Sequence, residues 1–144
     1  MATNIERTIT VPGSADKVFA YVADFSNTAE WDPGIVSAER TGSGPVGEGS
    51  AFDLVARFKG RDLATTYRIT EFDPPSRVVL VGGTNNFTST DIITVTPATE
   101  GVQIGYRAIF ELSGIMRLSE PFLKGTFNRL ADDAVAGLKV VLSR

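Results

Sequence analysis

The chain contains no cysteine and no histidine among its 144 residues. Without cysteine it forms no disulfide, binds no iron–sulfur cluster and has no thiol nucleophile. Without histidine it lacks the most common general base and metal ligand of proteins. Any catalysis would therefore use carboxylates, tyrosine, lysine, arginine or bound water, and we expect neither a metal nor another cofactor.

Positive charge and long hydrophobic runs are also scarce. Fourteen lysine and arginine residues face 17 aspartate and glutamate residues, which gives a net charge of -3 and a pI near 4.9. The basic residues are scattered, so we expect no nucleic-acid partner and no binding to an anionic membrane surface. The longest aliphatic run, Val78–Val81, is far too short to cross a bilayer, and the first four residues do not resemble a secretion signal. We therefore expect a cytoplasmic protein without membrane insertion.

Segments in which apolar and polar residues alternate occupy much of the chain, as expected for half-buried β-strands. Turn-forming residues separate several of them, at Lys59-Gly60, Asp73-Pro74-Pro75 and Gly82-Gly83. Connections this short favour an antiparallel meander, because parallel crossovers need a dozen residues or more. The expected strands are Asn4–Val11, Ile35–Thr41, Ser50–Phe58, Asp62–Phe72, Arg77–Gly83, Asn86–Thr96 and Val102–Leu112.

Helical spacing of apolar residues occurs near both ends. Ser14 is a good N-cap for a helix over Ala15–Phe25, and Ser26–Trp31 predicts a second, short helix. Glu120–Leu142 predicts a long helix of about 34 Å, which only a curved sheet could cover. Gly137 borders its apolar face, and close contact with a strand would explain a glycine there. One α+β domain, residues 1–144, is the expected organisation.

The order of these elements and several motifs resemble the START-like superfamily called SRPBCC, and within it bacterial polyketide cyclase/dehydrase-type proteins. The motifs are Val11–Phe19, Ala23-Asp24-Phe25, Trp31-Asp32-Pro33 and Glu71–Arg77. The resemblance implies a helix-grip fold like that of the birch-pollen allergen: a seven-stranded antiparallel sheet around a long C-terminal helix, with two short helices after strand 1. It also implies a cavity between sheet and helix for a hydrophobic ligand, and many members have no catalytic role.

The segment Asp62–Phe72 leaves open which side chains face that cavity. Its alternation favours the face that carries Tyr67 as the interior. The resemblance to aromatase/cyclases points instead to Arg68, and it turns Asp91 and Tyr106 inward as well. Arg68 and Asp91 would then form an ion pair in the cavity, since either charge alone would be costly to bury. The alternative is that both are ordinary surface charges.

Trp31, the only tryptophan, either anchors the short second helix by packing or lines the cavity. Our leading interpretation is a protein that sequesters or transports a lipid or polyketide-like molecule, as a monomer or homodimer. A cyclase or dehydratase is the alternative, with Arg68 polarising a carbonyl and Asp91 or Tyr106 relaying a proton. A role in protein interaction is a third. The expected ligand-binding residues are Trp31, Phe52, Tyr67, Arg68, Asp91, Tyr106, Phe110 and Phe127.

Overall fold

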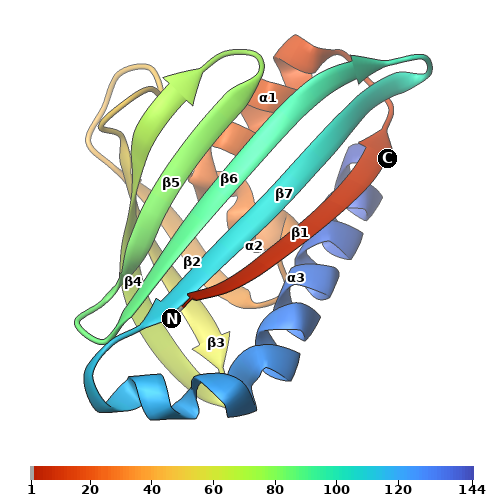
Figure 1. Cartoon of the computed structure of the whole chain (residues 1–144). Coiled ribbons are helices and arrows are strands. Elements are labelled where there is room, and N and C mark those ends of the chain that lie inside the picture. Colours follow the sequence, from red (N-terminus) through yellow and green to blue (C-terminus); the bar gives the residue numbers. More distant parts are fainter. Residues whose placement is uncertain (1) are drawn as a thin grey trace.

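A seven-stranded antiparallel sheet curves around one long helix in the computed structural model, which describes residues 2–144 (Figure 1). The strands lie in the order β1-β7-β6-β5-β4-β3-β2, so the first strand joins the last and the others form the predicted meander. The strand bounds are β1 Ala2–Val11, β2 Ile35–Thr41, β3 Ala51–Phe58, β4 Arg61–Asp73, β5 Arg77–Thr84, β6 Phe87–Ala98 and β7 Gly101–Leu112.

Two short helices follow β1, as predicted, although the first ends earlier than expected. Helix α1 spans Ala15–Ala23, and the Ser14 side chain caps it by accepting from the backbone N–H of Lys17 at 3.4 Å. Asp24 then leaves the helical conformation, and its carboxylate accepts from the backbone N–H of Ser26. This second cap starts a separate 3-10 turn, η1 (Phe25–Asn27), which leads directly into α2 (Thr28–Trp31).

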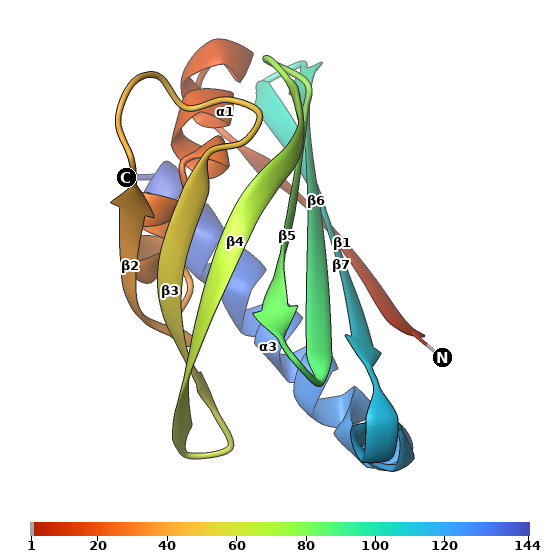
Figure 2. The same cartoon turned by 90° about the vertical axis from the view of Figure 1, so that its left-hand side faces the viewer.

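The C-terminal helix α3, Glu120–Leu142, follows a 3-10 turn η2, Gly114–Ser119. It lies beside β1 and α2 and runs diagonally past the sheet (Figures 1 and 2). Its buried face keeps the predicted spacing of three and four residues. The buried apolar side chains on it are Leu123, Phe127, Ala131, Ala134, Val135 and Leu138.

Two glycines allow close approach between elements, and at Gly137 the neighbour differs from the predicted strand. A Cβ on Gly137 would lie 1.9 Å from the carbonyl oxygen of Trp31, so this glycine admits the end of α2 and not a strand. Gly82 lies within β5, which runs one residue past its predicted end at Gly83. A Cβ there would lie 2.7 Å from the ring of Tyr67, which precedes Arg68, the β4 partner of Val81. Both glycines therefore position side chains that line a cavity.

The buried residues form two apolar clusters at opposite ends of the sheet. The larger cluster includes α1 and the sheet residues beneath it, such as Leu80, Ile93 and Ile104. The smaller one surrounds Phe127 on the first half of α3 and includes Leu112. Between residues 2 and 144, no helix combines the length and apolar character needed to cross a membrane.

Candidate ligand-binding cavity

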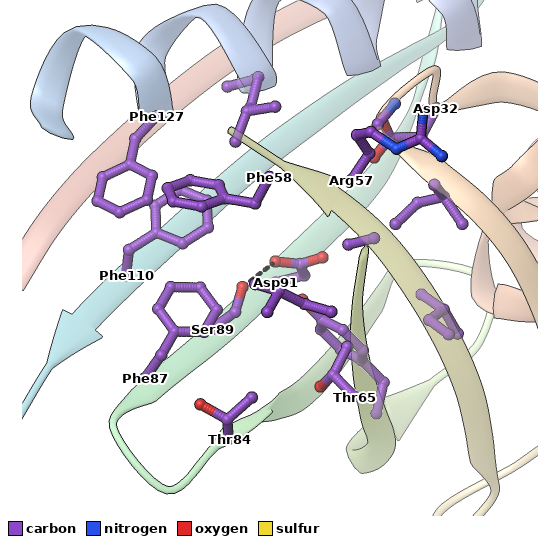
Figure 3. Close-up of a pocket in the computed structure, with 18 of the residues that line it drawn as sticks. Asp32, Arg57, Phe58, Thr65, Thr84, Phe87, Ser89, Asp91, Phe110 and Phe127 are labelled. Carbon is purple, nitrogen blue, oxygen red and sulfur yellow. Dashed lines mark hydrogen bonds between the residues drawn. The ribbon is translucent and has the colours of Figure 1, made fainter. Parts of the chain in front are cut away.

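A cavity of about 440 Å³ lies between the sheet and the first half of α3 (Figure 3). Its wall comes from η1, α2, β2 to β7 and α3, so most of the chain contributes to one space. The β3–β4 hairpin, the β5–β6 turn and η2 border one end, which we call the mouth. Its basic residues are Lys59 and Arg61, whereas Arg57 lies farther along β3, beside Asp32 (Figure 3), where its backbone N–H donates to the carbonyl of Gly34. The opposite, deep end is bordered by α2 and by the middle of β6 and β7.

Four phenylalanines form an aromatic cluster on the mouth side of the cavity (Figure 3). Phe110 and Phe127 stack with ring centroids 4.4 Å apart, and Phe58 stacks on Phe127 at 5.9 Å. Phe87 stacks on Phe110, also at 5.9 Å. The members come from β3, β6, β7 and α3, so the cluster joins the sheet to the helix. Flat aromatic faces of this kind pack well against apolar ligands.

A polar cluster occupies the deep end and centres on Asp91, which is only 7% exposed. One of its carboxylate oxygens accepts from the Ser89 hydroxyl at 3.3 Å, and the other accepts from the Tyr106 hydroxyl at 3.5 Å. The period of two along β6 turns Ser89, Asp91 and Ile93 inward, and Tyr106 is buried on β7, so Asp91 and Tyr106 face inward as the family resemblance implied. Tyr67 completes the cluster from β4.

No cation balances Asp91: of the ion pairs formed by residues 2–144, none includes this carboxylate. Burial raises the pKa of Asp91 to about 7, the nearby Asp32 carboxylate adds to the shift, and the hydroxyls of Ser89 and Tyr106 oppose it. Burial also raises the pKa of Asp32 to about 6. For Tyr67 and Tyr106, burial and then the charge of Asp91 raise the pKa of the hydroxyl. The deep end therefore binds protons more readily than exposed carboxylates do.

Trp31 both packs in the core and lines the cavity. The packing role and the cavity-lining role, given above as alternatives, are therefore compatible. Its ring meets Phe25 edge-on at 6.4 Å and Tyr106 edge-on at 6.5 Å. The indole Nε1 is buried and has no hydrogen-bond partner within residues 2–144. A buried donor left without a partner costs about 1–3 kcal/mol, and such groups are rare in native proteins.

Arg68 does not enter the cavity, and the prediction that it pairs there with Asp91 is wrong. It is exposed on the outer face of β4, where its guanidinium donates to the carbonyl of Gly49 at 3.1 Å. Leu63, Thr65 and Tyr67 line the cavity from the other face, as the alternation alone predicts. The physical reason is the two-residue period: Tyr67 and Arg68 are neighbours on one strand and cannot face the same side.

Phe52 is also not a wall residue. It is completely buried in the larger apolar cluster, directly across the strands from Tyr67, and its ring lies 6.3 Å from that of Phe25. The other residues proposed for ligand binding all line the cavity. They are Trp31, Tyr67, Asp91, Tyr106, Phe110 and Phe127.

Sequence reasoning missed three wall residues that matter chemically. Asp32, which follows the short second helix, lines the cavity, and its carboxylate accepts from the backbone N–H of Gly34 at 2.9 Å. Phe58 and Phe87 also line the cavity, and their places beside hairpin turns were the available sign that they border an opening. Within residues 2–144, no three acidic side chains are grouped so that they could hold a metal ion.

A curved antiparallel sheet that encloses a cavity against a C-terminal helix is the START-like helix-grip architecture. The family model described as "Polyketide cyclase / dehydrase and lipid transport" matches residues 2–143, and the chain belongs to this family. A relative from Mycobacterium tuberculosis, an uncharacterized protein, is 31% identical over 115 residues, which cover 77% of each chain.

Two solved structures are similar in fold. The Zhui aromatase/cyclase from Streptomyces sp. R1128 superposes with a TM-score of 0.80 at 15% identity, over 99% of this chain and 94% of the other. A START superfamily protein from Mycobacterium smegmatis gives 0.79 at 14% identity, over 96% of both chains. At these identities the likeness shows the fold alone.

Proposed function

We propose that the protein binds a hydrophobic small molecule in the cavity and sequesters or transports it. The observation that carries the proposal is the cavity itself: about 440 Å³, enclosed by the sheet and α3 and lined mainly by apolar side chains. Ligand sites in proteins typically measure about 300–1,000 Å³ and combine an apolar wall with a few polar groups. The aromatic cluster and the polar cluster provide that combination.

The driving force would be removal of apolar surface from water, worth roughly 25 cal/mol for each Å² buried. A ligand with two or three fused rings fits a space of this size and would contact the faces of Phe58 and Phe110. The family description, which includes lipid transport, and the fold shared with an aromatase/cyclase both support a ligand of lipid or polyketide type.

Titration with N-phenyl-1-naphthylamine, a neutral fluorophore that brightens in apolar surroundings, tests the proposal. We expect saturable binding at about one molecule per chain. The variant Ala131→Met should weaken it at least fivefold, because Ala131 lines the cavity from α3 and a longer side chain fills that space. Ala136→Met, an exposed position on the same helix, is the matched control and should bind like wild type. Folded protein without saturable binding would contradict the proposal.

One observation favours a second candidate, an enzyme of the cyclase or dehydratase type. Asp91 lies in an apolar cavity beside Tyr106, and its pKa of about 7 suits proton transfer at neutral pH. Arg68, which was expected to polarise a carbonyl, lies outside the cavity, so no cation would assist from the deep end. Mass spectrometry of a bound polyketide-like compound tests this candidate: the wild type should remove a molecule of water from it, and Asp91→Asn should not.

A further inference from the structure

We infer that the protein docks the mouth of its cavity on the surface of an anionic lipid bilayer, where the exposed side chains Ile115, Leu118 and Phe122 enter the interface. This inference rests on the proposed function, because a hydrophobic molecule held in the cavity would pass to or from the bilayer at the mouth. Its basis is one surface of the molecule, on which an apolar patch, cations without ion-pair partners and the opening of the cavity come together.

The first step is a patch of large apolar side chains on η2 and the first turn of α3. Ile115 and Phe122 are each 83% exposed, and Leu118 is 75% exposed. A spacing of three residues within the 3-10 turn and of four residues into the α-helix keeps them on one side of the segment. Neighbouring apolar side chains that are this exposed mark an interaction surface.

The second step is that this patch continues into the cavity. Met116, in the same turn η2, is 36% exposed and also lines the cavity. Leu63, on β4, is 37% exposed and lines it as well. Both views of the fold place η2 and the β3–β4 hairpin at the same end of the molecule (Figures 1 and 2). With this end against a bilayer, a molecule leaving the cavity would meet apolar side chains and then lipid.

The third step is the positive charge around the patch. Lys59 and Arg61 line the mouth from the β3–β4 hairpin, and Arg117 and Lys124 lie on η2 and α3 beside the patch. All four are exposed, and none takes part in an ion pair formed by residues 2–144. They are scattered along the sequence, which predicted no binding to an anionic membrane surface. The fold brings the elements that carry them to one end (Figures 1 and 2).

Few acidic side chains oppose these cations. Asp62, in the hairpin, is already paired with Arg57 at 2.8 Å. Glu120, at the start of α3, is only 3% exposed. Glu111 follows the cavity-lining residue Phe110 on β7, so the two-residue period places it on the outer face of the sheet. The chain as a whole has a net charge of -3, so the mouth differs in sign from the rest of the molecule.

A bilayer fits this surface better than a protein partner does. On a protein, each of the projecting apolar side chains would need a pocket of matching shape, whereas the boundary of the acyl chains admits side chains of any shape. Helices that lie in this boundary combine Phe or Leu on one side with Lys or Arg beside them. Each cation near an anionic surface raises the affinity by a factor of about five, and salt screens this attraction.

Sedimentation with lipid vesicles tests the charge requirement. At low ionic strength, the wild type should bind phosphatidylcholine vesicles that contain about one third phosphatidylglycerol at least tenfold more tightly than pure phosphatidylcholine vesicles. Salt at about 0.5 M should remove most of this preference. Lys59→Gln with Arg61→Gln should weaken binding to the anionic vesicles at least tenfold. Lys17→Gln with Lys139→Gln, two exposed cations on α1 and near the end of α3, is the matched control and should bind like wild type.

Substitutions in the patch test the apolar requirement. Leu118→Ser with Phe122→Ser should weaken binding to the anionic vesicles at least tenfold, whereas Val140→Ser, 60% exposed near the other end of α3, should not. Neither Leu118 nor Phe122 lines the cavity, so fluorophore affinity without vesicles should stay at the wild-type value. Phe122→Trp adds an indole to the patch. Its emission should shift to the blue on anionic vesicles and be quenched by brominated lipid, and Val140→Trp should show neither change.

Three results would overturn the inference: no binding of the folded wild type to anionic vesicles, equal binding to both kinds of vesicle, or binding that survives in the Leu118→Ser, Phe122→Ser variant. The first would leave the patch to a protein partner. A dimer that this variant abolishes, measured by sedimentation equilibrium without vesicles, would also overturn it and assign the patch to a second copy of the chain. Loss of fluorophore binding in the folded wild type would instead reject the proposed function, whatever the vesicles show.

Discussion

The two ends of the cavity are built in different ways. The deep end holds polar groups without a cation and is backed by the larger apolar cluster, with Trp31 fixed by direct contact between its backbone and Gly137. The mouth holds stacked phenylalanines and cations on hairpins, beside a segment whose side chains Ile115, Leu118 and Phe122 are exposed. Backbone contact defines the deep end, whereas side chains alone define the mouth. Substitutions should therefore be tolerated less well at the deep end.

Replacing Gly137 should have the largest effect on stability. In Gly137→Ala the new Cβ would lie 1.9 Å from the Trp31 carbonyl oxygen, so α2 or α3 would have to move. We expect a loss of about 3–4 kcal/mol in the free energy of unfolding, above the usual cost of overpacking because the obstacle is backbone. Chemical denaturation measures it.

Gly125→Ala on the same helix is the matched control, because a Cβ there meets nothing within 4 Å. It should stabilise the protein by about 0.5–1 kcal/mol, the normal gain of alanine over glycine in a helix. Equal stability of Gly137→Ala and wild type would mean that the deep end is not defined by this backbone contact.

The pH dependence of stability should reveal the uncompensated carboxyl groups of the deep end. The pKa of Asp91 is raised to about 7 from an ordinary value of 3.8, so between these values the folded state binds more protons than the unfolded chain. The free energy of unfolding should therefore fall as pH rises from about 4 to about 7, by at most about 1.4 kcal/mol for each pH unit. Asp32, whose pKa is raised to about 6, adds to the same trend over a narrower range.

We expect the contribution of Asp91 to total at most about 4 kcal/mol, the product of the pKa difference and the limiting slope. Denaturation curves at several pH values measure it as the difference in slope between the wild type and Asp91→Asn, which cannot titrate. The exposed substitution Asp53→Asn should keep the wild-type slope. If the free energy of unfolding changes with pH in the same way for wild type and Asp91→Asn, Asp91 keeps an ordinary pKa and the deep end is more hydrated than the burial of Asp91 implies.

Local features of the fold and contacts between distant elements differ in how well the sequence predicts them. Local patterns predicted the strands, the long helix and the inward direction of Tyr67, because alternation and helical spacing depend on nearby residues alone. The approach of Gly137 to Trp31 and of Asp32 to Asp91 depends on how distant elements meet, and no local pattern reports it. Such contacts require the tertiary structure.

The error over Arg68 has a different origin. Its inward direction came from an ungapped comparison with a related branch, and a shift of one residue moves a side chain to the opposite face of a strand. The structure has an irregularity in the pairing of β4 with β5 between Ile69 and Glu71, so register along this strand is not uniform. The alternation of the chain itself was the better guide to which side chains face the cavity.

At the mouth, Phe87→Leu should cost about 1 kcal/mol in stability. The change keeps most of the apolar volume but removes the ring that stacks on Phe110 at 5.9 Å. Because Phe87 is only partly buried, neighbouring side chains have room to adjust. Fluorophore affinity should fall two- to fivefold. Unchanged fluorophore affinity would show that the ring of Phe87 does not contact the bound molecule.

The smallest effect is expected for Arg68→Ala. Its exposed guanidinium donates to the carbonyl of Gly49, and an exposed hydrogen bond of this kind contributes little. We expect a change within about 0.5 kcal/mol, no change in fluorophore affinity, and additivity with Asp91→Asn, because the two side chains lie on opposite faces of the sheet. Unfolding curves of both single variants and the double variant measure the coupling. A coupling energy above about 1 kcal/mol would show that Arg68 interacts with Asp91 and that its side chain enters the cavity.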